Sequence, residues 1–474
     1  MKYLNLSNEG IGKFLSLKVL ITLSALFIFS SASYAVPPTW VSFEDDETPP
    51  FYGFTAGDRG GSYGMTADIN RDVTPTIPIL FGDYAAYLSD SWERVTLPID
   101  ITEGLVQVWF YDDNYGGGTP GTQTSANALR LRSEEDDPAR DPGWPLYYLA
   151  VDLKGEYTGH GRSGFMEYYT IAKNDDPNAG MGVQFGYPVG SVNDEVMRAT
   201  ETWHLVSFDI DNGITTLSVD REMVDIVETH TLSELELLCR SGWYQTRPGE
   251  EKIMRWDGIA INPKMHSTDF SSTPSWMTFA GSSSLVFDIT RESQTVPFEF
   301  IPGCSRVARF SEGNQSMSCS WNATEGSIEI WYWDNISDEG GNPDNGSIDI
   351  IVSSAADAGV YTRMRTYESV MGSLTDKWYL VSPQSPSGMG NSYNLPRQHG
   401  WNKMVFHKMD GCLYVSLNSE LVSSYDYRWD SPPDDLVLEI VSRDGYNDGF
   451  PLWLGRIVMT GTSTSAVNNW NLYY

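Results

Sequence analysis

The sequence predicts an all-β protein that consists of two tandem antiparallel β-sandwich domains of the jelly-roll type. Three observations predict this fold class. Short segments alternate apolar and polar residues, and Gly, Pro and Asn separate them. The second half of the chain repeats the pattern of the first half. Helical periodicity is nearly absent, with short candidates only at residues 231–238 and 355–358.

The N-terminus has the layout of a secretory signal peptide. Three lysines precede an uncharged apolar run at residues 19–29, and small residues occupy positions 33 and 35. The run is shorter than the roughly 20 apolar residues that a membrane-spanning helix needs. We therefore expect residues 1–35 to be removed. The mature chain is then secreted, periplasmic or at the cell surface, without insertion into a membrane.

Charge and length limit the partners and the number of domains. The chain carries 31 basic and 63 acidic residues, a formal net charge of −32. Nucleic acid and anionic membrane surfaces would be repelled by such a chain. A mature length of about 440 residues exceeds one ordinary core and fits two domains.

Two pairs of segments repeat in order along the chain. EGLVQVWFYDDN begins at Glu103 and EGSIEIWYWDN begins at Glu325, an offset of 222 residues. WHLVSFDIDNGITTLSVD begins at Trp203 and WNKMVFHKMDGCLYVSLN begins at Trp401, an offset of 198 residues that still holds at Ile457. A constant offset over such a distance predicts two copies of one design.

Alternation within these segments predicts strands with one face toward a core. The segments that begin with Trp203 and Trp401 predict hairpins, because Asn-Gly and Asp-Gly pairs accept the positive φ of tight turns. The residues expected to face the two cores are Val106, Val108, Phe110, Val206, Phe208, Leu217 and Val219 in the first copy and Ile328, Ile330, Tyr332, Met404, Phe406, Val415 and Leu417 in the second.

The boundary between the copies is expected where small and polar residues gather. Residues 264–283 fit a linker, with one sandwich domain at residues 36–263 and the other at residues 284–474. Trp276 and Phe279 within this segment could dock on a domain.

The Glu-Gly turn before an aromatic strand, the Trp-led hairpin and the closing strand together resemble the concanavalin A-like lectin/glucanase superfamily. Its laminin G-like branch is the most similar. The resemblance covers residues 40–262 and 284–461. It implies a jelly-roll sandwich in each half. The fold hosts lectins, adhesion modules, glucanases and polysaccharide lyases, so the resemblance leaves the function open.

The sequence argues against catalysis of the glucanase type. Glucanases of this fold are similar in carrying Glu-x-Asp-x-x-Glu on one strand, which places both carboxyls on one face. The nearest approach here runs from Glu329 to Asp334, and residues five apart point to opposite faces of a strand unless a bulge intervenes. The first copy also has Gln107 in the place of Glu329.

The sequence favours a non-catalytic protein that binds polysaccharide or cell-surface glycan. Aromatic rings stack on sugars, and amides and carboxylates bind the hydroxyl groups. The alternative is that these rings form a second layer of the core. Two other functions stay open: a structural or adhesive protein that binds protein partners, and a polysaccharide-degrading hydrolase or lyase. The candidate ligand-binding residues are Gln107, Trp109, Tyr111, Glu329, Trp331 and Trp333.

Acidic residues follow both aromatic strands and make calcium the candidate cofactor. Oxygen ligands on a flexible loop suit Ca²⁺, and the resemblance to laminin G-like domains implies a calcium ion in a rim loop. Polar turns of an acidic exported protein would have the same composition. The candidate ligands are Asp112, Asp113, Asp334 and Asp338.

The cysteines predict one disulfide bond. Cys304 and Cys319 flank a plausible turn, and an exported chain can keep a disulfide. Closing a loop of about 15 residues would contribute about 3 kcal/mol to stability. Cys412 lies in an apolar strand pattern and is expected to be a buried thiol.

Overall fold

In the computed structural model, the described residues belong mainly to strands and to the tight turns between them. None of them belongs to a helix long and apolar enough to cross a membrane. The predicted signal peptide lies outside the described residues. The structure describes residues 39–41, 55–56, 70–71, 79–81, 85–87, 94–99, 101–112, 126–134, 147–153, 168–174, 195–197, 202–211, 213–228, 232–240, 255–280, 286–290, 301, 304–310, 315–334, 348–366, 377–383, 393–421, 428–442 and 452–461.

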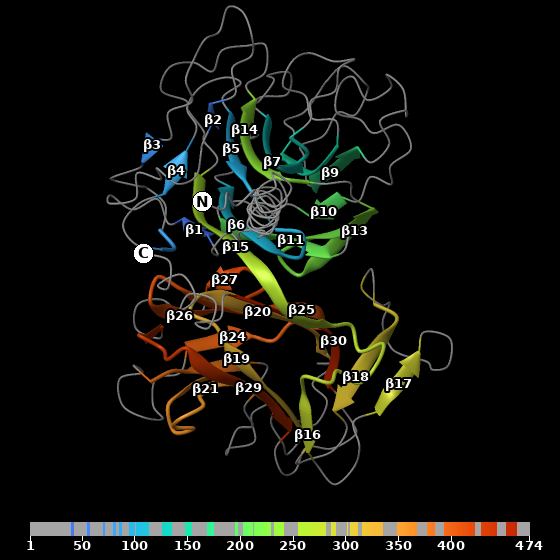
Figure 1. The fold of residues 1–474 in the computed structure, drawn as a ribbon, viewed down its shortest axis with the longest axis vertical. Coiled ribbons are helices and arrows are strands. Elements are labelled where there is room, and N and C mark those ends of the chain that lie inside the picture. The colour runs from blue at the N-terminus through green and yellow to red at the C-terminus, as the bar shows by residue number, and fades with distance from the viewer. Residues whose placement is uncertain are drawn as a thin grey trace, which may run out of the picture. The chain divides into compact units, whose positions relative to one another are not determined.

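The first half of the chain forms a β-sandwich, which we call the first sandwich (Figure 1). One layer is a seven-stranded sheet of order β10-β9-β8-β7-β14-β5-β2, its outer sheet. These strands are β2 (Thr55–Ala56), β5 (Arg94–Pro98), β7 (Ala126–Arg132), β8 (Tyr148–Leu153), β9 (Tyr168–Asn174), β10 (Glu195–Met197) and β14 (Glu234–Arg240). The other layer contains β1 (Thr39–Val41), β3 (Asn70–Arg71), β4 (Ala86–Tyr87), β6 (Gly104–Asp112), β11 (Thr202–Asp211), β12 (Ile214–Val219), β13 (Glu222–Glu228) and β15 (Arg255–Thr268).

The second half forms the second sandwich in the same way. Its outer sheet has the order β24-β23-β22-β21-β29-β19-β16, which corresponds strand for strand to that of the first sandwich. These strands are β16 (Thr278–Ala280), β19 (Ser316–Asn322), β21 (Ile348–Ser354), β22 (Tyr361–Thr366), β23 (Lys377–Val381), β24 (Tyr393–Pro396) and β29 (Asp435–Ser442). The facing layer contains β17 (Val286–Thr290), β18 (Arg306–Phe310), β20 (Gly326–Asp334), β25 (Gly400–Met409), β26 (Cys412–Leu417), β27 (Glu420–Leu421), β28 (Trp429–Asp430) and β30 (Leu452–Thr460).

The long strand β15 joins the two sandwiches and corrects the predicted linker. Its first part pairs with β6, and its last residues, from Lys264 to Thr268, pair with β30 (Figure 1). The facing layers of both sandwiches thereby form one 16-stranded sheet. Within the predicted linker, β16 also pairs with β19, and Trp276 and Phe279 pack against the second core. The docking of these two rings is therefore confirmed.

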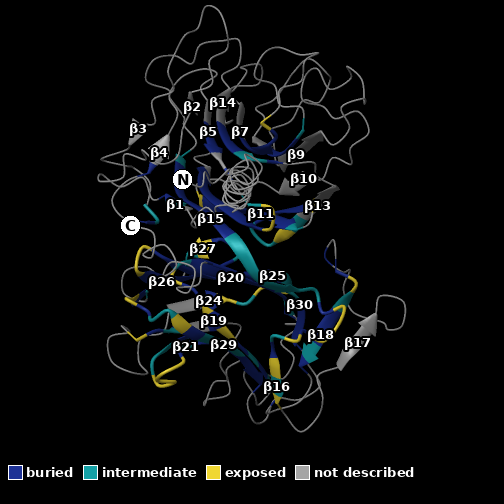
Figure 2. Ribbon diagram, in the orientation of Figure 1, coloured by how far each residue is buried: buried dark blue, intermediate teal, exposed yellow. Residues whose placement is uncertain are grey.

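Each sandwich has its own apolar core, and the predicted strand faces are confirmed. All residues expected to face the two cores belong to the corresponding clusters of buried residues. The strands that carry them are dark blue in Figure 2. The second hairpin turns through Asp410 and Gly411, whose φ angles are 49° and 65°, as an Asp-Gly turn requires.

The two short helix candidates are wrong. Residues 234–240 form strand β14, in which Leu235 and Leu237 face the core and Glu234 and Glu236 point the other way. Residues 355–358 form a turn between β21 and β22.

The repeat extends to individual hydrogen bonds at equivalent positions of the two sandwiches. The amide of Leu205 donates to Oδ1 of Asp220 at 3.1 Å, and the amide of Lys403 donates to Oδ1 of Asn418 at 2.9 Å. Both pairs are separated by the predicted offset of 198 residues. Asp220 and Asn418 also share a positive φ, of 54° and 49°. The two sandwiches are therefore copies of one design down to the turn that follows each hairpin.

Candidate functional site

The predicted ligand-binding residues at the centre of the aromatic strands lie where the two sandwiches touch, a contact we call the inter-sandwich interface. Gln107 and Glu329 occupy equivalent positions, and Nε2 of Gln107 donates to Oε2 of Glu329 at 3.4 Å. The rings of Trp109 and Trp331 are 1% and 0% exposed. These four side chains are closed to a polysaccharide in this arrangement. A ligand role for them stays a prediction.

The ends of the two aromatic strands differ. Tyr111 is buried and packs edge-on against Trp203 at 5.3 Å, in a cluster that includes Tyr414 of the second sandwich. Trp333, at the equivalent position of the second sandwich, is only partly buried. Of the six predicted ligand-binding residues, Trp333 is the one that reaches the surface.

Trp333 belongs to an accessible aromatic group, which we call the tryptophan surface and which consists of Trp333, Trp401, Trp453 and His399. Its ring lies edge-on to Trp401 at 5.7 Å and to His399 at 5.3 Å. Trp453 packs in the same cluster. His399 is exposed, and Trp401 is partly buried. Three neighbouring strands, β20, β25 and β30, supply the three indoles on the face that points away from the second core.

Two glycines allow this arrangement. Gly400 has a φ of 105°, which a residue with a side chain rarely adopts, and it turns the chain between His399 and Trp401. A Cβ on Gly455 would lie 2.7 Å from the Trp401 ring, so only glycine lets this ring approach β30 so closely. Asn402 holds the turn through its Nδ2, which donates to the carbonyl oxygens of Gln398 and Gly400 at 2.8 and 2.7 Å.

A fixed ion pair lies at the end of β20, where Asp334 follows Trp333 and points to the opposite face of the strand. Nε and one terminal nitrogen of Arg397 donate to the two carboxylate oxygens of Asp334 at 2.8 and 2.6 Å. Asp334 is 1% exposed, whereas the Arg397 side chain is 22% exposed. Such bidentate pairs hold a guanidinium in one orientation. Arg397 is therefore held in one orientation at the end of β20, close enough to act on the buried Tyr332.

This ion pair does not fit the predicted calcium role of Asp334. Both of its oxygens already accept hydrogen bonds from a cation that a second cation would have to displace. The side chains of Asp112, Asp113 and Asp338 lie outside the described residues. Within the described part of the chain, no group of three or more acidic, His or Cys side chains could hold a metal ion.

The predicted disulfide bond is not formed in the structure. Cys304 and Cys319 are free and buried, and so is Cys412, as expected. The Cys304 thiol donates to the Gly455 carbonyl oxygen, whereas Cys319 contacts Met459 in the second core. Cys304 lies outside that core, beside Trp331. The two thiols thus contact β30 from opposite faces of the facing layer.

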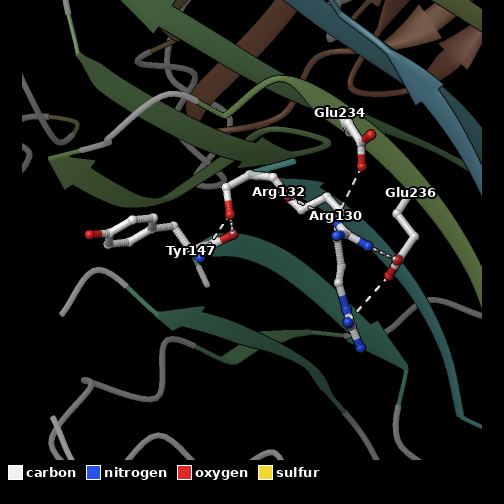
Figure 3. Close-up of polar contacts among 6 residues, drawn as sticks. Arg130, Arg132, Tyr147, Glu234 and Glu236 are labelled. Atoms are coloured by element: carbon white, nitrogen blue, oxygen red, sulfur yellow. Dashed lines mark hydrogen bonds and ion pairs between the residues drawn. The ribbon is translucent and has the colours of Figure 1, made fainter. Parts of the chain in front are cut away.

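A second polar group, the charged cluster, lies on the outer sheet of the first sandwich and contains Arg130, Arg132, Glu234 and Glu236 (Figure 3). Glu236 pairs with Arg130 at 3.2 Å and with Arg132 at 3.1 Å, and Arg132 also lies 3.4 Å from Glu234. Arg130 stacks over the Tyr148 ring at 5.5 Å. The Glu234 side chain is 22% exposed, and the other three are at most 5% exposed. Glu234 is therefore the accessible edge of an enclosed network.

A neighbouring backbone pairing fixes the end of β7 beside this cluster. The Ser133 amide donates to the Tyr147 carbonyl oxygen at 3.0 Å, and the Tyr147 amide donates to Ser133 Oγ at 3.0 Å. Figure 3 shows the Tyr147 ring pointing away from the charged groups, and it packs against the first core. Tyr147 therefore positions the strand and adds no group to the cluster.

The second sandwich lacks this cluster. Glu236 pairs with Thr96, and Glu439 pairs with Ser318. Thr96 and Ser318 are equivalent positions, 222 residues apart, so Glu439 is the equivalent of Glu236. With this alignment, Ile351 stands in the place of Arg130, Ser353 in the place of Arg132 and Val437 in the place of Glu234. The sandwich fold therefore does not require these charges.

Sequence reasoning missed most of both groups. Trp401 and Trp453 could have been found, because they alternate with core residues such as Met404 and Leu454. The charged cluster also has a signal, since LRLR at residues 129–132 and ELEL at residues 234–237 alternate leucine with opposite charges. No sequence pattern indicates that the His399 ring contacts Trp333. This contact depends on the positive φ of Gly400, which a sequence pattern does not show.

No known family matches the sequence, and no curated protein is similar to it. Among solved structures, the chain is similar to the CBM2 module of the evolved Dit of Lactobacillus casei BL23 phage J-1, with 15% identity, 42% of this chain and 96% of that chain covered, and a TM-score of 0.29. Bacillus licheniformis β-glucanase has 7% identity, coverage of 42% and 97%, and a TM-score of 0.28. The Ca²⁺-bound exoplasmic/lumenal domain of VIP36 has 11% identity, coverage of 42% and 91%, and a TM-score of 0.26. TM-scores of this size support no inference about function.

Proposed function

We propose that this protein binds glycan at the tryptophan surface of the second sandwich without cleaving it. The proposal rests on an exposed His399 and on partly exposed Trp333 and Trp401, whose rings are held in edge-on contact with one another. Rings of this kind stack on the C–H faces of sugars.

The rigidity of this surface favours binding. Trp333 is held by two ring neighbours, His399 and Trp401. Groups that are already ordered lose little conformational entropy when a ligand binds. The partial burial of the rings is consistent with this role, since a platform needs one open face and one supported face.

The test compares retention on a glycan array and on insoluble polysaccharides. His399→Ala and Trp333→Ala should each reduce retention at least tenfold while the protein stays folded. The chain offers a matched control, because His266 and Trp276 form a second His–Trp pair, stacked at 4.9 Å. Trp276→Ala should leave retention unchanged. Equal losses from the Trp276 and Trp333 variants, or unchanged retention in both site variants, would refute the proposal.

Glycan cleavage is a second candidate function, and the charged cluster is the observation that favours it. Glu234 and Glu236 point to one face of β14, and Arg132 binds both carboxylates. Hydrolases need a carboxyl pair on one face, and the second sandwich shows that the fold does not require these residues. The test measures release of reducing sugar from glycan. Cleavage would be established if the wild type releases reducing sugar and Glu234→Gln does not, while the variant is still retained on glycan.

A further inference from the structure

A lysine, a glutamine and a glutamate meet inside the inter-sandwich interface, apart from the tryptophan surface. Lys403 is 0% exposed, and its Nζ donates to Oγ of Ser207 and of Ser218, both at 3.2 Å. Nε2 of Gln107 lies 3.5 Å from the same Ser207 Oγ and 3.4 Å from Oε2 of Glu329. One serine hydroxyl thus contacts both the amine and the carboxamide, which belong to different sandwiches.

The polar groups of this site are incompletely satisfied. Among the described residues, Nζ of Lys403 binds only serine hydroxyls and the Trp331 ring, whose centre is 5.5 Å away, and Oε1 of Gln107 accepts no hydrogen bond. A buried ammonium without a direct anionic partner and a buried carbonyl without a donor each cost free energy. A structural network alone gives no reason to keep both.

The environment favours the nucleophilic form of the lysine. Burial lowers the pKa of Lys403, against the raising effect of the Glu329 and Asp220 carboxylates. A neutral amine in an apolar site is an effective nucleophile. The Glu329 carboxylate is held in place by the indole N–H of Trp331, which donates to Oε1 at 2.7 Å, so that Oε2 faces Gln107.

We propose that Lys403 and Gln107 form an isopeptide bond that links the two sandwiches covalently, with Glu329 as the proton carrier. A proton first passes from the Lys403 ammonium to the Glu329 carboxylate, which makes both groups neutral. The lone pair of Nζ then attacks Cδ of Gln107 and forms the new C–N bond. Glu329 gives its proton to Nε2 as the old C–N bond breaks, and it takes up the proton that Nζ releases. Nε2 leaves as ammonia.

The reaction is balanced and within reach of the side chains. One amide replaces another, one molecule of ammonia is formed, and no oxidant, reductant or cofactor is consumed. Nζ of Lys403 and Nε2 of Gln107 lie 3.2 and 3.5 Å from the same Ser207 Oγ, so the two side chains already reach one point. The repeat allows one such bond only, because Leu205 occupies the position equivalent to Lys403 in the first sandwich.

Mass spectrometry of the purified, fully denatured and reduced protein tests the proposal. The intact mass should be lower than that of the linear chain by one ammonia. A digest should contain a branched peptide that joins the Gln107 and Lys403 segments. Glu329→Gln and Lys403→Met should each restore the full mass. The control is Lys408→Met, because Lys408 is also a buried lysine of β25 but pairs with Asp434 at 3.0 Å, and this variant should keep the loss.

The wild-type digest decides the question even where a variant fails to fold. Linear peptides for both segments, together with the full intact mass, would overturn the proposal. Loss of water in place of ammonia would also overturn it, since that would indicate a bond from Lys403 to a carboxylate.

Discussion

Gly326 is the residue whose replacement should most directly test the packing of the second sandwich. It begins β20, next to β30, at the Glu-Gly turn that both copies share. A Cβ added there would lie 2.2 Å from the carbonyl oxygen of Thr460 and 2.7 Å from Cα of Gly461. Both atoms belong to the backbone, so no side-chain rotation can relieve the clash. The strand itself must move.

The expected cost of Gly326→Ala follows from this geometry. Overpacking a well-packed site costs about 1–3 kcal/mol, and the upper end applies because two backbone segments are involved. Gly104→Ala should behave alike, since its Cβ would lie 2.4 Å from the carbonyl oxygen of Asn262, the residue equivalent to Thr460. The unfolding midpoint of a sandwich-sized unit should fall by about 2–4 °C for each kcal/mol.

Urea unfolding followed by tryptophan fluorescence measures the effect, with the free energy taken at an unchanged m-value. Gly411→Asn is the control, because a Cβ there meets nothing within 4 Å and asparagine tolerates its φ of 65°. A free energy of unfolding for Gly326→Ala within about 0.5 kcal/mol of the wild type would refute the packing argument.

Three further predictions concern single groups. Burial raises the pKa of Asp220, but His204 and hydrogen bonds from Ser419 and Leu205 outweigh this effect and lower the pKa. The free energy of unfolding that the wild type gains over Asp220→Asn should therefore be constant above about pH 4 and shrink as the pH falls further. A stability difference between the two proteins that grows in acid would contradict this. Burial raises the pKa values of Cys304 and Cys319 to about 12. A maleimide at pH 8 should therefore label neither thiol until the protein unfolds. If the unfolded, unreduced chain is not labelled either, the two cysteines form the disulfide. Asp334→Asn should destabilise the protein by about 2–3 kcal/mol with or without calcium, because it breaks a mostly buried ion pair. Destabilisation only in the presence of calcium would instead indicate that Asp334 binds the metal ion.

The fold could be predicted because strand alternation is a local property. In β20, Ile328, Ile330 and Tyr332 alternate with Glu329 and Trp331, and the core takes one set in full. The same alternation in the Trp-led hairpins fixed their inward residues. A buried face requires this period, so the sequence carries it in every long strand.

The errors occurred where a short segment fits two periods or two environments. Leu232, Leu235 and Leu238 have a helical spacing, although Leu235 and Leu237 belong to the face of a strand that points to the core. Residues 264–268 are partly exposed, so their polar composition resembles that of a linker while their backbone continues the sheet.

The site could be predicted only in part, because a sequence does not show what covers the second face of a sheet. Trp331 and Trp333 lie two residues apart on the same face of one strand. The first is 0% exposed at the inter-sandwich interface, and the second is partly exposed at its edge. The difference depends on a contact with residues of the other sandwich, more than a hundred positions away.

The interface itself explains why two copies of one design carry different residues at its centre. Equivalent positions of a two-fold arrangement meet each other, as the contact between Gln107 and Glu329 shows. Two glutamates at this point would place like charges against each other in a dry site, which costs several kcal/mol. A glutamine in one copy removes that repulsion and supplies a donor to the remaining carboxylate. Lys403 can then lie near a single negative charge, whereas the first copy, which lacks that charge, keeps Leu205 at the same position. The divergence of the two copies at these positions is thus coupled, and it is this asymmetry that brings an amine, a carboxamide and a carboxyl group together.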